Sequence, residues 1–281
     1  MKFFICSFLL FLSLSCSWRP THPLYRSHYN YLETDTLTFI PMQETDYFLV
    51  ILVDARHLDY SNAKTFIKTM RKHPDDCSKN GDVGHAWIYL QGLKDNQRFI
   101  IEGGHSGELG VIQAKYFNGI MNNIDYGYAN PSPSQMCKRT HEPNPVKYLW
   151  ESQHDGYFQQ GSGRHNPTFA VKVNLTQEQF EQILLYINAY HFSDYAITGN
   201  QCSSFVAQVA VLAGVDVNCH VTIPVEPFMH VKGGALHLWE DPNYSLLTVS
   251  SPDVIEHCLM QLAKEHKVEY ALKWYLSRKK T

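Results

Sequence analysis

The pattern of apolar and polar positions predicts a strand followed by a helix near the start of the ordered chain. The continuous apolar run 48–53 is typical of a buried strand, and polar residues, among them Asp54 and Arg56, follow it directly. Residues 61–72 then carry apolar side chains at helical spacing. The strand is therefore expected to deliver polar groups to one end of a sheet, ahead of a surface helix.

A second pattern predicts a hairpin. Side chains alternate along residues 83–90, so His85 and Trp87 share one face of the predicted strand. After a turn, residues 98–102 can return beside it as the second arm. This arm ends at Glu102, and the glycines that follow are expected to let the backbone turn sharply.

Periodicity returns after a long irregular segment. Residues 168–173 alternate as a strand, and Thr176 with Gln179 forms the capping box of a helix that extends to about residue 191. A final helix is expected to start at residues 251–253 and to extend toward Leu276.

Between these two helices lies the segment that places Cys202 after a Gly-Asn turn. Apolar residues beyond the cysteine fall on one helical stripe, and Gly214 is the expected stop. Cys202 is thus predicted at the first turn of a buried helix. Unpaired N–H groups and partial positive charge at a helix N-terminus stabilise a thiolate, although buried unpaired cysteine is also common as a packing residue.

The N-terminal residues have the features of an export signal. Lys2 precedes an apolar run that is too short to span a membrane comfortably, and the segment ends at Cys16. Residues 12–16 resemble a bacterial lipoprotein signal, which implies lipidation of Cys16 and attachment to a membrane of the cell envelope. An ordinary cleaved secretory signal and a retained short anchor are the alternatives.

The domain organisation follows from these patterns. Residues 1–16 form the signal peptide and residues 17–42 a tether. Residues 43–250 form one α+β domain with an insertion at about 120–167, and residues 251–281 form a C-terminal helix. The composition, with 44% hydrophobic and 18% charged residues in 281, is that of a globular protein, and the net charge of −3 gives no support for nucleic-acid binding.

Export changes the interpretation of the cysteines, because disulfides persist in oxidising compartments. The residues concerned are Cys77, Cys137, Cys202, Cys219 and Cys258. An odd number of thiols cannot all pair with one another, so one is left over, as a catalytic cysteine requires. The sequence does not assign the pairing, and all of them can also stay reduced.

The quoted stretches resemble the circularly permuted NlpC-like branch of the papain-like thiol hydrolases, which is similar in design to the lecithin retinol acyltransferase group. The matching segments are Gly-His-Ala-Trp-Ile at 84–88, Phe-Ile-Ile-Glu at 99–102, and Asn-Gln-Cys-Ser-Ser-Phe-Val at 200–206. The chain departs from the family pattern at Gln201, which separates Asn200 from Cys202, and in its middle insertion. The resemblance implies a papain-like fold with a central antiparallel sheet packed against helices.

The same resemblance implies roles for single residues. Cys202 would be the nucleophile, His85 the general base and then acid, and Glu102 the group that orients the imidazole, with His105 as the competitor for that third role. The backbone N–H of Cys202 would help to hold the oxyanion. No cofactor is expected. No metal site is expected either, because neither His-Glu-x-x-His nor Cys-x-x-Cys occurs in the sequence.

Three functions remain open on the sequence. The first is a cell-envelope cysteine hydrolase that cleaves amide bonds in peptidoglycan peptides through an acyl-thioester. The second is a lipid acyl hydrolase or acyltransferase, and the third is an envelope lipoprotein without catalysis. A polar, open cleft beside Cys202 would favour a peptide substrate, and an apolar groove would favour a lipid.

Overall fold

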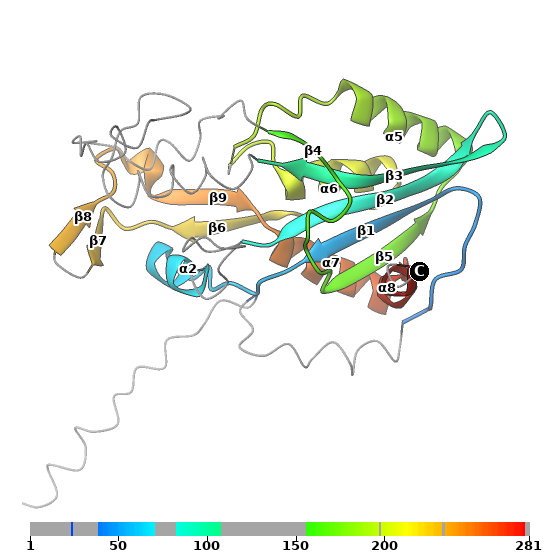
Figure 1. Ribbon diagram of the computed structural model, residues 1–281. Coiled ribbons are helices and arrows are strands. Elements are labelled where there is room, and N and C mark those ends of the chain that lie inside the picture. Colours follow the sequence, from blue (N-terminus) through cyan, green and yellow to red (C-terminus); the bar gives the residue numbers. More distant parts are fainter. Residues whose placement is uncertain are drawn as a thin grey trace, which may run out of the picture.

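A six-stranded antiparallel sheet is the centre of the molecule (Figure 1). The computed structural model describes residues 24, 39–70, 83–107, 156–196, 198–231 and 234–278. The order of the strands is β10-β5-β1-β2-β3-β4. Their bounds are β1 (Phe48–Asp54), β2 (His85–Lys94), β3 (Gln97–Ser106), β4 (Tyr157–Gln160), β5 (Phe169–Asn174) and β10 (Glu269–Tyr270).

Helices and two small hairpin-like sheets complete the described fold. The helices are α2 (Ala63–Met70), α5 (Gln177–Ala189), α6 (Cys202–Leu212), α7 (Pro252–Lys264), α8 (Leu272–Arg278) and the short 3-10 helix η3 (Pro242–Tyr244). The small sheets pair β6 (His220–Pro224) with β9 (Leu246–Ser250), and β7 (Phe228–Val231) with β8 (Gly234–His237). The predicted α+β class with a central antiparallel sheet is confirmed.

The two faces of the sheet bury different clusters, because successive strand residues point to opposite sides. One face carries Ala86, Ile88 and Leu90 of β2, which belong to a cluster with residues of α5, α6 and α7. The other face carries Trp87 and Tyr89, which cluster with residues of α8. Both faces of the sheet are therefore covered, and every residue of β1 is buried.

The predicted hairpin is formed, with longer arms than the pattern indicated. Asp95 and Asn96 connect β2 to β3 with φ values of 53° and 59°, which suits a two-residue hairpin turn. The second arm does not turn at its glycines, as the sequence had suggested, but continues to Ser106 and pairs with β4. A Cβ on Gly104 would lie 2.8 Å from the Ala86 carbonyl oxygen, so this glycine serves close strand packing.

The C-terminal segment also differs from its prediction. Its helix starts as expected, with Ser251 as the N-cap and Pro252 in the first turn, but α7 ends at Lys264. His266 then adopts a φ of 58°, which a helix does not tolerate. The chain returns as β10 along β5 before α8 begins, so one predicted helix is two helices separated by a strand.

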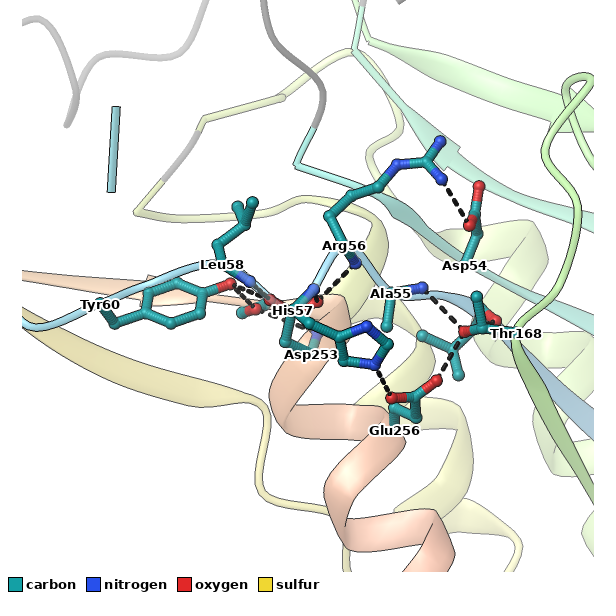
Figure 2. Close-up of polar contacts among 11 residues, drawn as sticks. Asp54, Ala55, Arg56, His57, Leu58, Tyr60, Thr168, Asp253 and Glu256 are labelled. Atoms are coloured by element: carbon teal, nitrogen blue, oxygen red, sulfur yellow. Dashed lines mark hydrogen bonds and ion pairs between the residues drawn. The ribbon is translucent and has the colours of Figure 1, made fainter. Parts of the chain in front are cut away.

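A buried carboxylate holds the turn that follows β1 against the start of α7 (Figure 2). Asp253 accepts backbone N–H groups from Arg56 at 2.7 Å, His57 at 2.9 Å and Leu58 at 2.6 Å. The Tyr60 hydroxyl donates to the same side chain at 2.9 Å. His57 has a φ of 55°, so these successive N–H groups form a concave anion site of the kind called a nest.

A second buried carboxylate, one turn along α7, extends this junction to β5 (Figure 2). Glu256 contacts Nε2 of His57 with one oxygen and accepts the Thr168 hydroxyl at 2.6 Å with the other. The Thr168 hydroxyl oxygen accepts the N–H of Ala55 at 3.0 Å. The two carboxylates thus fix the end of β1, the start of β5 and the first turns of α7 together.

Several predictions on the N-terminal half of the chain lie outside the described residues. These are the signal peptide with Cys16, nearly all of the tether, and residues 108–155, which include most of the predicted insertion. The last residues of that insertion are described, and they supply β4 and the loop to β5. Among the helices described, none is both long and apolar enough to cross a membrane.

Replacement of Asp253 by Ala is expected to lower the free energy of unfolding by about 3–5 kcal/mol, because it leaves several buried donors without their acceptor. Asp241→Ala is the matched control, since Asp241 is exposed and caps the short helix η3 through Asn243 N. The control is expected to cost about 1 kcal/mol or less. Urea unfolding of both variants measures the difference, and equal losses would contradict the role given to Asp253.

Candidate active site

The predicted helix start at the cysteine is confirmed. Cys202 is the first residue of α6, only 3% of it is exposed, and Gln201 is the N-cap. The side-chain oxygen of Gln201 accepts the Cys202 thiol at 3.3 Å and the Ser203 N–H at 3.3 Å. Gln201 in turn donates from Nε2 to the Ser250 carbonyl at 2.6 Å, which fixes the cap beside the thiol.

Helix α6 lies on the face of the sheet that carries Ala86, Ile88 and Leu90. Its residues Phe205 and Val206 are wholly buried in the same cluster as these β2 side chains. The helix contacts both β2 and β3. The cysteine is therefore carried by a helix packed across the hairpin in which the sequence analysis placed its partner residues.

His105 of β3 lies on the same face as α6 and is completely buried. Its Nε2 is 2.8 Å from the Phe192 carbonyl oxygen, and its Nδ1 is 3.0 Å from the Tyr190 hydroxyl. Because a carbonyl can only accept, Nε2 carries the hydrogen and Nδ1 accepts from Tyr190. Burial lowers the pKa of His105 to about 4, so the ring is neutral at pH 7.

Tyr190 connects this histidine to helix α6. Burial raises the pKa of Tyr190 well above its ordinary value. The rings of Tyr190 and Phe192 also pack on Phe205 of α6, with centroids 5.1 and 5.4 Å away. The structure therefore places Tyr190 and His105 beside Phe205, which lies one turn along α6 from Cys202.

His85 lies on the opposite face of the sheet from α6. It stacks on Trp87, with ring centroids 5.7 Å apart, and on His165, at 4.8 Å. Burial, then His165 and His105, lower the pKa of His85 well below its ordinary value. In the described part of the chain its Nε2 has no hydrogen-bond partner. The expected pair of Cys202 with His85 is thus not formed as a hydrogen bond through this nitrogen.

Glu102 also lies on the face opposite α6. It is paired in register with Tyr89 and accepts a hydrogen bond from the Tyr275 hydroxyl of α8. This contact raises the pKa of Tyr275 in addition to the effect of burial. The structure joins Glu102 to the C-terminal helix, and it does not bring this carboxylate to His85 or to the start of α6.

A polar cluster that the sequence analysis did not assemble surrounds His85. Asp54, the residue paired with His85 across β1 and β2, accepts from Arg56 Nη1 at 2.9 Å and from His165 Nδ1 at 2.9 Å. The sequence pattern did predict polar residues at the end of β1. His165 gave no signal, because it lies in a segment without periodicity.

Within the described ranges, none of Cys202, Cys219 and Cys258 forms a disulfide. Burial raises the pKa of both Cys219 and Cys258. Cys77 and Cys137 lie outside the described residues. Within the described ranges no group of three His, Cys, Asp or Glu side chains is arranged to hold a metal ion.

No protein-family model matches this chain, and no curated protein or solved structure matches it either.

The buried state of His105 predicts a pH dependence of stability. Its pKa falls from an ordinary value of 6.5 to about 4 in the folded protein, so the unfolded chain binds a proton first as the pH drops. The contribution of His105 to the free energy of unfolding is expected to be constant above pH 6.5. It is expected to fall by about 3 kcal/mol as the pH approaches 4.

Burial also lowers the pKa of His85, so both histidines make stability fall as the pH drops. The contribution of His105 is therefore obtained as the difference between the wild type and a His105 variant. The measurement is the free energy of unfolding between pH 4 and 7 for the wild type and His105→Gln. The variant is expected to have the smaller slope. Parallel curves for the two proteins would show that His105 is not held neutral by the fold.

Proposed function

We propose that the protein is a cysteine-dependent acyl hydrolase of the cell envelope, with a permuted papain-like arrangement and Cys202 as nucleophile. The observation that carries the proposal is the position of Cys202 at the first residue of a helix that packs on the β2–β3 hairpin. A helix N-terminus favours a thiolate and a developing oxyanion beside it. The helix contacts β3, whose His105 lies on the face that α6 covers.

His105 is the better supported partner for the thiol, in place of His85. It lies on the face that α6 covers, and its Nδ1 accepts from Tyr190, whose ring packs on Phe205 of α6. In the proposed reaction the thiol proton moves through the Tyr190 hydroxyl to Nδ1. The sulfur then attacks the acyl carbon while the backbone N–H of Cys202 binds the oxyanion.

The second half of the reaction returns the proton. The imidazolium of His105 returns its Nδ1 proton through the Tyr190 hydroxyl, which protonates the leaving amine or alcohol as the acyl-thioester forms. Water then attacks the thioester, and its proton passes through the Tyr190 hydroxyl to His105 and by the same route back to the sulfur as the acid is released. The strong burial of His105 opposes the imidazolium, so substrate binding has to supply a partner for that charge.

Amide bonds in peptidoglycan peptides are the proposed substrates, on the basis of the family resemblance and the export signal ending at Cys16. A lipid ester is the second candidate. The observation that favours it is the aromatic cluster of Tyr190, Phe192 and Phe205 that packs on the first turns of α6. Both substrates form the same kind of acyl-thioester, so one assay can separate them.

The test is intact-mass analysis of the protein after brief exposure to purified muropeptides or to short-chain acyl esters. The expected result is an acyl adduct on Cys202 with release of amine from muropeptides. Adducts from esters alone would favour the lipid function. Cys202→Ala is expected to abolish the adduct, whereas Cys219→Ala, which replaces an equally buried thiol, is expected to retain it.

The same assay assigns the histidine. A general base contributes about 10²–10⁴-fold, so His105→Gln is expected to lower kcat/KM by at least about 100-fold. Tyr190→Phe removes only the hydroxyl and is expected to cause a smaller loss, while His85→Gln is expected to change the rate little. A large loss of kcat/KM in His85→Gln, with no loss in His105→Gln, would show that His85 is the general base. An absence of any adduct with both substrate classes would favour a lipoprotein without catalysis.

A further inference from the structure

The polar cluster at the end of β1 has the composition of an anion site, and it lies on the face of the sheet that α6 does not cover. We define the Asp54 cluster as Asp54, Arg56, His85 and His165. These residues come from the end of β1 and the turn after it, the start of β2, and the loop between β4 and β5. The loop and the turn thus close around the paired ends of two central strands.

Two members of the Asp54 cluster are buried and two reach solvent. The side chain of Asp54 is 2% exposed and His85 is 4% exposed, whereas the side chains of His165 and Arg56 are 20% and 23% exposed. Asp54 and His85 therefore form the buried part of the cluster, and a small solute can reach His165 and Arg56 from solvent. Both outer side chains are held by the same carboxylate, which fixes their positions.

His85 supplies the evidence that a ligand belongs here. Its Nε2 is buried and has no hydrogen-bond partner in the described part of the chain. An unsatisfied buried nitrogen of this kind destabilises a fold, so such atoms are rare and call for a bound partner. The ring stacks on His165 at a centroid distance of 4.8 Å, which places it beside the solvent-open members of the cluster.

The chemistry of the cluster selects the kind of ligand. Both oxygens of Asp54 already accept hydrogen bonds, from Arg56 and from His165, so the carboxylate is not open to a cation, and the described residues form no metal-binding group. Asp54 accepts a hydrogen bond from Nδ1 of His165, which directs the Nε2 edge of that ring away from the carboxylate. Arg56 and Nε2 of His85 can then both donate to one ligand.

We propose that the Asp54 cluster binds a small oxyanion, either a carboxylate or a phosphate group. The guanidinium of Arg56 is the main source of positive charge, and Nε2 of His85 gains the acceptor that it lacks. Asp54 positions Arg56 and His165 without contacting the anion. Because this site lies on the opposite face from α6, it is independent of the proposed thiol chemistry.

The test is the thermal midpoint of unfolding and isothermal titration of the full exported chain with inorganic phosphate and with acetate. Each is compared with sodium chloride at equal ionic strength. A ligand that binds only the folded state raises the midpoint with its concentration. The expected result is saturable stabilisation by phosphate or acetate beyond that of chloride. The stronger of the two identifies the anion as a phosphate or a carboxylate.

Variants locate the binding. Arg56→Gln is expected to weaken it by about tenfold or more, because a charged hydrogen bond is lost, and Arg56→Lys is expected to recover part of it. The matched control is Arg98→Gln, which removes another arginine with a nearby glutamate partner, Glu44, and is expected to bind like the wild type. Cys202→Ala is also expected to bind normally, which separates this proposal from the thiol reaction.

Three outcomes would overturn the proposal. One is equal stabilisation by chloride, which would show an effect of ionic strength alone. Another is equal weakening in Arg56→Gln and Arg98→Gln, which would show an adventitious ion only. The third is unchanged binding in Arg56→Gln, which would place the anion elsewhere. His85→Gln is a supplementary variant, and the Arg56 series decides the result if that buried change prevents folding.

Discussion

The carboxylate of Asp253 is the contact on which the arrangement of the described fold depends. Three successive N–H groups, from Arg56 to Leu58, converge on it, and His57 takes up a left-handed backbone conformation to make this possible. Such a conformation costs a non-glycine residue about 1–3 kcal/mol and persists only where its surroundings hold it. The Asp253 nest therefore fixes where β1 ends, and it places the side chains that follow.

Two separate sets of polar groups result at the same end of the hairpin. The period of two along a strand sends Ala86 toward α6 and His85 toward the other face. His105 meets the aromatic rings beside α6, while Asp54 and His165 surround His85. A single sheet can in this way hold a nucleophile on one face and a binding site on the other, each with its own histidine.

Much of the fold was predictable because it depends on local signals. The buried run of β1, the turn at Asp95 and Asn96, the Thr176 capping box and the helix start at Cys202 all follow from residues a few positions apart. The break after α7 was missed, because the apolar spacing continues past His266 and only its backbone conformation ends the helix.

The site was less predictable, because it depends on which face of the sheet a residue occupies. Sequence alternation shows that His85 and Trp87 share a face, but it does not show which face a distant helix will cover. His105 was noted only as a competitor, and Tyr190 was not considered, since their contact joins residues 85 positions apart. His165 lies in an irregular segment, where no periodicity indicates its direction.

The most direct test of Cys202 as a nucleophile is its alkylation rate against pH, followed by peptide mass spectrometry. Cys219 is an internal reference, because both thiols are 3% exposed and burial raises the pKa of Cys219. Faster labelling of Cys202 than of Cys219 near neutral pH, slowed by His105→Gln, is the predicted result. Equal, slow labelling of the two thiols, unaffected by that substitution, would contradict a nucleophilic Cys202.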